Sequence, residues 1–251
     1  MGLKFHNLKR EEALDRVCKH IRNRSFGSAA RTLFYINVHS YHLAKSDEDF
    51  RHCINQADTV LPDGSGISYA GKVFGRPIAE NLNGTDFTPA LCSKLAEERR
   101  SVYLLGGKQE VVGACIDYLE KTYPGLKVLG GRSGYFFQDE HEQILADINK
   151  HSPDLLLVAM GSPHQEKWIV RNVSRLDVGV CSAVGGLFDF WSGKYRRAPA
   201  WMRKSGIEWI HRFMQNPVKK WKRVIVEIPA FLTRVTFLSI RRMFGLKKAE
   251  A

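Results

Sequence analysis

Residues 155–163 read Leu-Leu-Leu-Val-Ala-Met-Gly-Ser-Pro, an apolar run that stops at a glycine. Six apolar residues bounded by Gly and Pro predict a strand that is buried on both faces. The residues that follow, 163–175, have the length and polarity of a helix. A buried strand, a small-residue loop and a helix form one βα unit, and such units build parallel sheets.

The same pattern recurs along the first three quarters of the chain. Strand-length apolar runs occupy residues 32–38, 59–61, 102–105, 127–129, 155–160 and 178–184. Helices are expected between them, near residues 40–57, 87–100, 108–122, 139–150 and 163–175. The sequence therefore predicts an α/β fold, a Rossmann-like and largely parallel sheet with helices on both faces. Ligands of such sheets bind outside the carboxyl ends of the strands.

The excess positive charge of the chain lies in its last quarter. The 251 residues carry a formal net charge of +12, yet residues 1–193 hold equal numbers of acidic and basic side chains. Residues 194–251 hold 15 Lys and Arg against only three Glu. We therefore expect residues 1–193 to form the α/β domain that carries the chemistry, and residues 194–251 to meet a polyanion.

Cysteine usage and the N-terminus indicate a reducing compartment. The five cysteines are scattered and form no Cys-x-x-Cys pair, which disfavours a disulfide framework or a structural zinc site. The first ten residues contain no apolar stretch of the kind that signal peptides carry. A location on the cytoplasmic side of the membrane is expected.

Small-residue loops follow several of the predicted strands. Gly106-Gly107, Gly161 and Gly185-Gly186 each come directly after an apolar run. One such glycine is usually only a turn residue. Several at one sheet edge predict a cleft lined by backbone N–H groups, which favour a phosphate-bearing ligand. Residues 64–71 contain three glycines, but their spacing does not match the dinucleotide-binding fingerprint.

Acidic residues stand at several expected strand or helix ends. Asp63, in Leu-Pro-Asp-Gly, is placed at the mouth of the sheet, although Pro-Asp-Gly is also a favoured turn sequence. Asp86, in Asn-Gly-Thr-Asp, could face a ligand or could complement the dipole in the first turn of a helix. Residues 47–49, Asp-Glu-Asp, look like a metal-binding Asp-x-Asp pair, but three acids after Ser46 are more typical of a helix start.

Histidine spacing does not predict a metal site. His39, His42 and His52 are close in sequence, but no third ligand at a matching spacing accompanies them. The helix expected after residue 163 begins with backbone N–H groups that suit a diphosphate. Gln165 or Glu166 in its first turn could hydrogen-bond a sugar or a base.

Taken in order, these short motifs resemble one known family. They are Asn37; Ala57-Asp58 with Leu61-Pro62-Asp63-Gly64; Asn83-Gly84-Thr85-Asp86; Leu104-Leu105-Gly106-Gly107; Gly134-Tyr135-Phe136; Gly161-Ser162-Pro163 with Gln165-Glu166; Val184-Gly185-Gly186 with Phe188-Asp189; Arg197-Ala198-Pro199; and Gly206-Ile207-Glu208-Trp209. Each motif alone is unspecific, but nine in this order between residues 34 and 223 are specific. The chain resembles the WecG/TagA/CpsF glycosyltransferases.

The resemblance implies an inverting transferase that needs no metal ion and no cofactor. Such an enzyme moves a sugar from a UDP-sugar, which is a substrate, to a polyprenyl-diphosphate-linked saccharide. The resemblance makes Asp63 the catalytic base and places Asn37 with it in the catalytic group. A carboxylate would take the acceptor's hydroxyl proton as the anomeric carbon is attacked. Cationic side chains and backbone N–H groups would stabilise the leaving diphosphate.

The resemblance assigns the other site residues to the donor. Gln165 matches a residue of the family's donor pocket. Arg212, Lys219 and Lys222 match basic residues of a C-terminal segment that completes the active site. The donor-binding set that this implies consists of Asp86, Gly106, Gly107, Gly161, Gln165, Glu166, Gly185, Gly186, Arg212, Lys219 and Lys222.

The chain departs from the teichoic-acid branch of that family at two places. That branch has Thr-Pro-Asn-Pro-Glu where residues 35–39 read Tyr-Ile-Asn-Val-His, and it has Glu-Arg where this chain has Glu80-Asn81. The missing Thr and Arg argue against an N-acetylmannosamine donor. The pattern is closer to exopolysaccharide members of the family, which predicts a hexosyltransferase that uses a UDP-hexose.

The basic C-terminal segment carries an apolar stripe at helical spacing. Its members are Val224, Ile228, Phe231, Val235 and Leu238. Glu227, Pro229 and Arg234 interrupt the apolar stretch, which disfavours a membrane-spanning helix. An amphipathic helix, kinked or split near Pro229, is expected to bind an anionic membrane surface peripherally, on the cytoplasmic face of the inner membrane. The alternatives are a helix that packs on its own domain and a homo-oligomer interface.

Two rival functions would use the same features. A nucleic-acid-binding protein also carries a basic tail. Here bulky aliphatic residues alternate with the basic ones at 219–228, which suits lipid better than bases, so no nucleic-acid partner is expected. A nucleotide-dependent oxidoreductase would share the sheet, but this chain lacks a proper glycine fingerprint with an acid about twenty residues further on.

Overall fold

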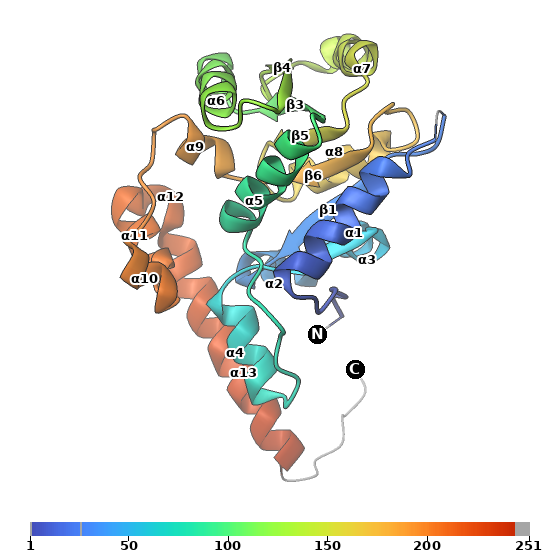
Figure 1. Cartoon of the computed structure of the whole chain (residues 1–251). Helices are drawn as coiled ribbons and strands as arrows, with labels where there is room; N and C mark the ends of the chain where they lie inside the picture. Colours follow the sequence, from blue (N-terminus) through green and yellow to red (C-terminus); the bar gives the residue numbers. More distant parts are fainter. Residues whose placement is uncertain (1, 26, 244–251) are drawn as a thin grey trace.

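A single six-stranded sheet forms the centre of the computed structural model, which describes residues 2–25 and 27–243 (Figure 1). The strand order is β2-β1-β6-β5-β3-β4, and every neighbouring pair is parallel. The strands are β1 (Arg31–Ile36), β2 (Thr59–Pro62), β3 (Ser101–Gly106), β4 (Lys127–Arg132), β5 (Leu155–Ala159) and β6 (Val180–Ala183). All six expected strands and the α/β class are confirmed.

Both faces of the sheet are buried, because successive side chains of a strand point to opposite sides. In β5, Leu155 and Leu157 join one hydrophobic cluster, whereas Leu156 and Val158 join the other. The first cluster is covered by α1 (Arg10–Arg22), α5 (Gly84–Glu97), α6 (Gln109–Thr122) and α9 (Leu187–Trp191). The second is covered by α2 (Val38–Ser46), α3 (Glu48–Gln56), α7 (His141–His151) and α8 (His164–Asn172). Helices on both faces of the sheet are therefore confirmed.

Some helices differ from the sequence expectation. The helix expected at 40–57 is two helices, because Asp47 ends α2 and caps α3 by accepting a hydrogen bond from the backbone N of Phe50 at 3.0 Å. Residues 47–49 thus form a helix start, the interpretation that the sequence favoured. The helix expected at 139–150 begins with a 3-10 turn, η1 (Gln138–Glu140), before α7. The helices α1, α9 and α4 (Ser65–Val73) were not expected, and α4 absorbs the glycine-rich residues 64–71.

The C-terminal segment is helical and packs on the α/β body. Its elements are α10 (Ala200–Lys204), α11 (Glu208–Gln215), α12 (Pro217–Trp221), the π-helix η2 (Lys222–Glu227) and α13 (Ile228–Met243). In Figure 1, α13 runs away from the sheet with α4 beside it, and the two helices are in contact. Pro229 lies inside a helical stretch that continues from α12 through η2 into α13, so it does not split the segment, and the π-helix η2 ends two residues before it.

The apolar stripe of this segment is partly buried against the body. Phe231 and Val235 are completely buried in a cluster with Val38, Tyr41 and Ala70 from α2 and α4. For Phe231 and Val235, the alternative prediction that the helix packs on its own domain is therefore confirmed. Residues 244–251, at the end of the basic C-terminal segment, lie outside the described residues. Among residues 2–25 and 27–243, no helix is both long and apolar enough to cross a bilayer.

Candidate active site

A pocket with a cavity volume of about 290 Å³ opens at the carboxyl end of the sheet. Its walls come from the loops that follow β1, β2, β5 and β6, from the first turn of α5, and from α11, α12 and η2. This is the edge at which parallel sheets bind ligands. Asp63 and Asn37 both line it, so the structure brings the two expected catalytic residues together.

Asp63 is held at the mouth of the pocket by its neighbours. Its backbone N donates to the carbonyl O of Ile36 at 2.8 Å, which continues the pairing of β2 with β1. The side-chain Nδ2 of Asn37 donates to Oδ2 of Asp63 at 3.0 Å. Oδ1 of Asn37 also caps α2, because it accepts from the backbone N of Ser40 at 3.1 Å. The carboxylate is thus oriented by a residue that is itself fixed at a helix start.

Gln165 joins the loops after β5 and β6 beneath the pocket. Its Oε1 accepts from the backbone N of Gly161 at 3.2 Å and from that of Gly185 at 3.0 Å. Gly161, Gly185, Gly186 and Gln165 all line the pocket, as expected. However, the backbone N–H groups of Gly161 and Gly185, which we expected to bind a phosphate, already donate hydrogen bonds to Gln165. This glycine-lined wall therefore has fewer free donors than its sequence implies.

Glu166 is a buried carboxyl group beside the same loop. The residue is 2% exposed, and its Oε1 accepts from Oγ of Ser162 at 2.7 Å and from Nε2 of Gln165 at 2.9 Å. Burial raises the pKa of this carboxyl group, and the hydrogen bonds from Ser162 and Gln165 oppose the rise. Glu166 lines the pocket, but these contacts serve chiefly to position Ser162 and Gln165.

Asp86, Gly106 and Gly107, which belong to the expected donor set, are not among the lining residues. A Cβ on Gly106 would meet the carbonyl O of Ala159 at 2.4 Å, and the backbone N of Gly107 donates to that same oxygen at 3.2 Å. These glycines therefore allow β3 and β5 to approach closely. Asp86 is 2.8 Å from Arg197 in an ion pair. Its position in the first turn of α5 agrees with the alternative that it complements a helix start.

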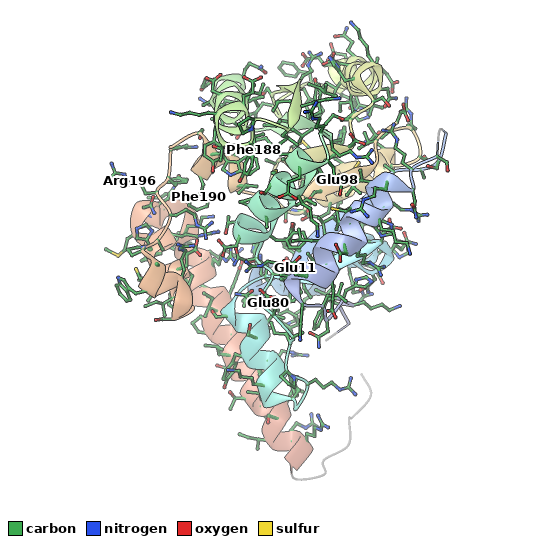
Figure 2. All side chains as sticks on the ribbon, in the orientation of Figure 1. Glu11, Glu80, Glu98, Phe188, Phe190 and Arg196 are labelled. Carbon is green, nitrogen blue, oxygen red and sulfur yellow. The ribbon has the colours of Figure 1, made fainter. Side chains whose placement is uncertain are left out.

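The C-terminal segment supplies the cations of the pocket. Arg212, Lys220 and Arg223 line it. The guanidinium of Arg212 lies 4.8 Å from the ring centroid of Phe190 and donates to Oε1 of Glu208 at 2.9 Å. Phe190 lies on α9, on the side of the molecule where α10–α12 pack (Figure 2). Side chains of the C-terminal segment therefore form one wall of the pocket.

Arg223 and Asp63 line the same pocket and interact electrostatically. Burial lowers the pKa of the Arg223 guanidinium, and the negative charge of Asp63 opposes that effect. An arginine remains protonated under these conditions. The structure thus places a fixed positive charge in the same pocket as the expected base.

The lining cations differ from those that the sequence indicated. Lys222 is exposed and is not among the lining residues, whereas its neighbour Arg223 is. The side chain of Lys219 lies outside what the structure describes, and Lys220 is at the pocket. Residues 222–227 form a π-helix, whose wider turn changes the direction of successive side chains relative to an α-helix. Residues 219–223 include four basic side chains, and the sequence alone does not indicate which of them point into the pocket.

His39 also lines the pocket, although its spacing from other histidines predicted no metal site. It lies in the first turn of α2, two residues after Asn37. Among the described residues, no group of three His, Cys, Asp or Glu side chains is arranged to hold a metal ion.

Comparison with known proteins gives a consistent family. The model of the glycosyl transferase WecG/TagA/CpsF family matches residues 1–244. A Bacillus subtilis (strain 168) protein named N-acetylglucosaminyldiphosphoundecaprenol N-acetyl-beta-D-mannosaminyltransferase is 28% identical over 222 residues, covering 88% of this chain and 84% of its own. Proteins of that name from Bacillus spizizenii (30% over 192 residues, 76% and 73% covered) and Staphylococcus aureus strain MW2 (29% over 240 residues, 94% and 90% covered) are also similar.

The names of these relatives bear on the expected branch and donor. All three describe transfer of N-acetylmannosamine. The sequence departures at residues 35–39 and 80–81 had favoured a hexose and an exopolysaccharide-type branch, and these relatives do not support that preference.

Proposed function

The chain belongs to the WecG/TagA/CpsF glycosyltransferase family, and from this we propose that it transfers one sugar, with inversion, from a UDP-sugar to a polyprenyl-diphosphate-linked saccharide. The observation that carries the proposal is the pocket itself. It holds an aspartate at the mouth of a parallel sheet, oriented by Asn37, and basic side chains line the same pocket.

The residues of the pocket suit each part of this reaction. The acceptor's hydroxyl oxygen forms a bond to the anomeric carbon, the bond from that carbon to the diphosphate breaks, and UDP leaves with the electron pair. Asp63 takes the hydroxyl proton. Arg212, Lys220 and Arg223 stabilise the negative charge that develops on the leaving diphosphate.

The acceptor and donor are inferred from the relatives. We propose a polyprenyl-diphosphate-linked N-acetylglucosamine as acceptor, because all three relatives are named for that substrate. Their names also make UDP-N-acetylmannosamine the first donor to test. UDP-glucose is the second donor to test. The sequence departures at residues 35–39 and 80–81, which favoured a hexose donor, lie near the pocket. Tyr35 lines it, and Oδ1 of Asn81 accepts from the backbone N of Gly64, the residue after Asp63, at 2.7 Å.

A donor screen tests this function directly. Purified protein is incubated with a prenyl-diphosphate-linked N-acetylglucosamine and a panel of UDP-sugars, and released UDP is measured. We expect UDP release that requires both the acceptor and one class of donor, with a matching disaccharide product by mass spectrometry. Release that is unchanged when the acceptor is left out would indicate hydrolysis, and it would contradict the proposal.

We also propose peripheral binding to the cytoplasmic face of an anionic membrane, where such an acceptor resides. Large apolar side chains on the C-terminal segment support this, because Val218, Trp221 and Ile225 are 82%, 52% and 62% exposed. They are spaced by three and four residues, and Lys222 lies among them. They are not the residues of the stripe that the sequence indicated, whose Phe231 and Val235 pack on the body.

Replacing the exposed apolar residues should release the protein from vesicles. For the double variant Trp221→Ser with Ile225→Ser, we expect at least roughly tenfold weaker co-sedimentation with phosphatidylglycerol vesicles, because two large side chains no longer leave water. Transfer to a short-chain, water-soluble acceptor should stay within about threefold of the wild type. Phe137→Ser is the matched control, since Phe137 is 79% exposed but lies after β4 and not on this segment. Equal vesicle binding by the double variant and the wild type would refute the assignment.

A further inference from the structure

His39 and Glu227 form a pair that joins the body to the C-terminal segment at the pocket. Nδ1 of His39 lies 2.8 Å from Oε2 of Glu227, which is 7% exposed. His39 belongs to the first turn of α2, whereas Glu227 ends the π-helix η2. The imidazole lines the pocket, and its side chain is 34% exposed.

The carboxylate fixes the tautomer of the ring. A carboxylate can only accept a hydrogen bond, so in the neutral imidazole the proton resides on Nδ1 and the lone pair on Nε2. Among the described residues, no protein group hydrogen-bonds Nε2 of His39. Glu227 therefore leaves His39 with a hydrogen-bond acceptor on the opposite edge of the ring.

A second histidine contacts the same residue without reaching the pocket. Nε2 of His42 lies 2.8 Å from the backbone O of Glu227. His42 is one turn further along α2 and is not among the lining residues. Both histidines thus help to dock the C-terminal segment, but only His39 can also meet a substrate. This difference makes His42 a matched control.

Burial, assisted by two neighbouring cations, lowers the pKa of His39 and favours its neutral ring. Burial lowers the pKa of the imidazole, and this outweighs the raising effect of the Glu227 carboxylate. Arg223 and Lys220, both from the C-terminal segment, lower the pKa of His39 further. Asp63 lines the same pocket. Near pH 7 the ring is therefore uncharged and its Nε2 can accept a proton or a hydrogen bond.

We propose that Nε2 of His39 recognises the acceptor sugar, by accepting a hydrogen bond from the hydroxyl group next to the one that Asp63 deprotonates. The inference rests on the proposed function. Asn37 holds Asp63 from the start of α2, and His39 follows in the first turn of that helix. The two groups therefore share the wall against which the attacking sugar must lie. A neutral acceptor suits a hydroxyl, whereas the diphosphate is matched by the cations.

Acceptor analogues that lack single hydroxyl groups test this contact. In the wild type, removing the recognised hydroxyl should lower kcat/KM for the acceptor by roughly 10- to 100-fold, because Nε2 of His39 loses its hydrogen-bond partner in the complex. His39→Ala should show a similar loss with the complete acceptor, and it should then discriminate less than about threefold between complete and deoxy acceptors. The KM for the donor should change little. His42→Ala should keep the discrimination of the wild type.

The pH dependence supplies a readout that a docking role alone would not change. In the wild type, kcat/KM for the acceptor should fall as the pH falls through the pKa of His39, because a protonated Nε2 cannot accept a hydrogen bond. Glu227→Gln removes the raising effect of the carboxylate, so this fall should move to lower pH. Histidine NMR titration of the protein without substrates should show the same downward shift for His39. The double variant His39→Ala with Glu227→Gln avoids an unpaired buried charge and guards against misfolding.

The outcomes separate the two proposals. If His39→Ala transfers sugar at the wild-type rate and still discriminates fully against deoxy acceptors, the role of His39 is refuted, whereas the proposed function stands. Equal effects of His39→Ala and His42→Ala on discrimination would do the same, because they would reduce both residues to docking. Absence of acceptor-dependent transfer in the wild type would overturn the proposed function, and the acceptor contact with it.

Discussion

Asp63→Asn should reduce acceptor-dependent UDP release by about 10³-fold, within the range that a positioned base contributes. The substituted amide keeps the size of the carboxylate, and its oxygen can still accept from Nδ2 of Asn37, which lies 3.0 Å from Oδ2 in the wild type. The fold and the pocket should therefore persist. What is lost is the ability to take up the hydroxyl proton while the bond to the anomeric carbon forms.

Two measurements accompany this variant. Calorimetric titration with UDP should give an affinity within about threefold of the wild type, since the cations are untouched, and thermal unfolding should be nearly unchanged. Turnover close to that of the wild type would exclude Asp63 as the base. A large loss of UDP affinity would instead show that the carboxylate organises the donor site.

Arg223→Gln should lower kcat/KM by roughly 10²- to 10³-fold, because it removes a charged donor from the group that balances the leaving diphosphate. Arg223 lines the pocket and interacts electrostatically with Asp63. Lys222→Gln is the matched control, because it removes one positive charge from the adjacent position, which is exposed and outside the pocket. That variant should stay within about threefold of the wild type.

The comparison of these two variants decides how the C-terminal segment acts. Equal losses would indicate that total charge, such as general attraction to an anionic surface, matters more than a placed guanidinium. A larger loss for Lys222→Gln would contradict the inward direction of Arg223. UDP release from a water-soluble acceptor is the appropriate assay, because it separates catalysis from vesicle binding.

The parts of the fold that the sequence predicted are those with a simple physical signature. A strand such as β5 is buried on both faces, so it reads as an uninterrupted apolar run before a glycine. By contrast, α1 precedes the first strand, and α4 is rich in glycine, so neither has the βα pattern that identified the other helices. The break at Asp47 depends on one capping hydrogen bond within a longer helical stretch.

The sequence predicted the positions of site residues that directly follow a strand. It did not predict positions that depend on contacts between residues far apart in the sequence. Asp63 and Asn37 follow neighbouring parallel strands, which places them together without further information. The use of the Gly161 and Gly185 N–H groups by Gln165 cannot be read from a glycine motif. The inward turn of Arg223 depends on a π-helix, and the pairing of His39 with Glu227 joins residues 188 positions apart.

The pocket wall formed by α11, α12 and η2 has a consequence for the timing of enzyme maturation. Every strand of the sheet is complete by Ala183, whereas Arg212, Lys220 and Arg223 come later in the chain. Under the proposed function, a nascent polypeptide that ends at Ala183 contains every strand and Asp63 but none of the cations proposed to bind the donor diphosphate. We therefore expect sugar transfer to begin only after the C-terminal helices have been synthesised and have packed on the body.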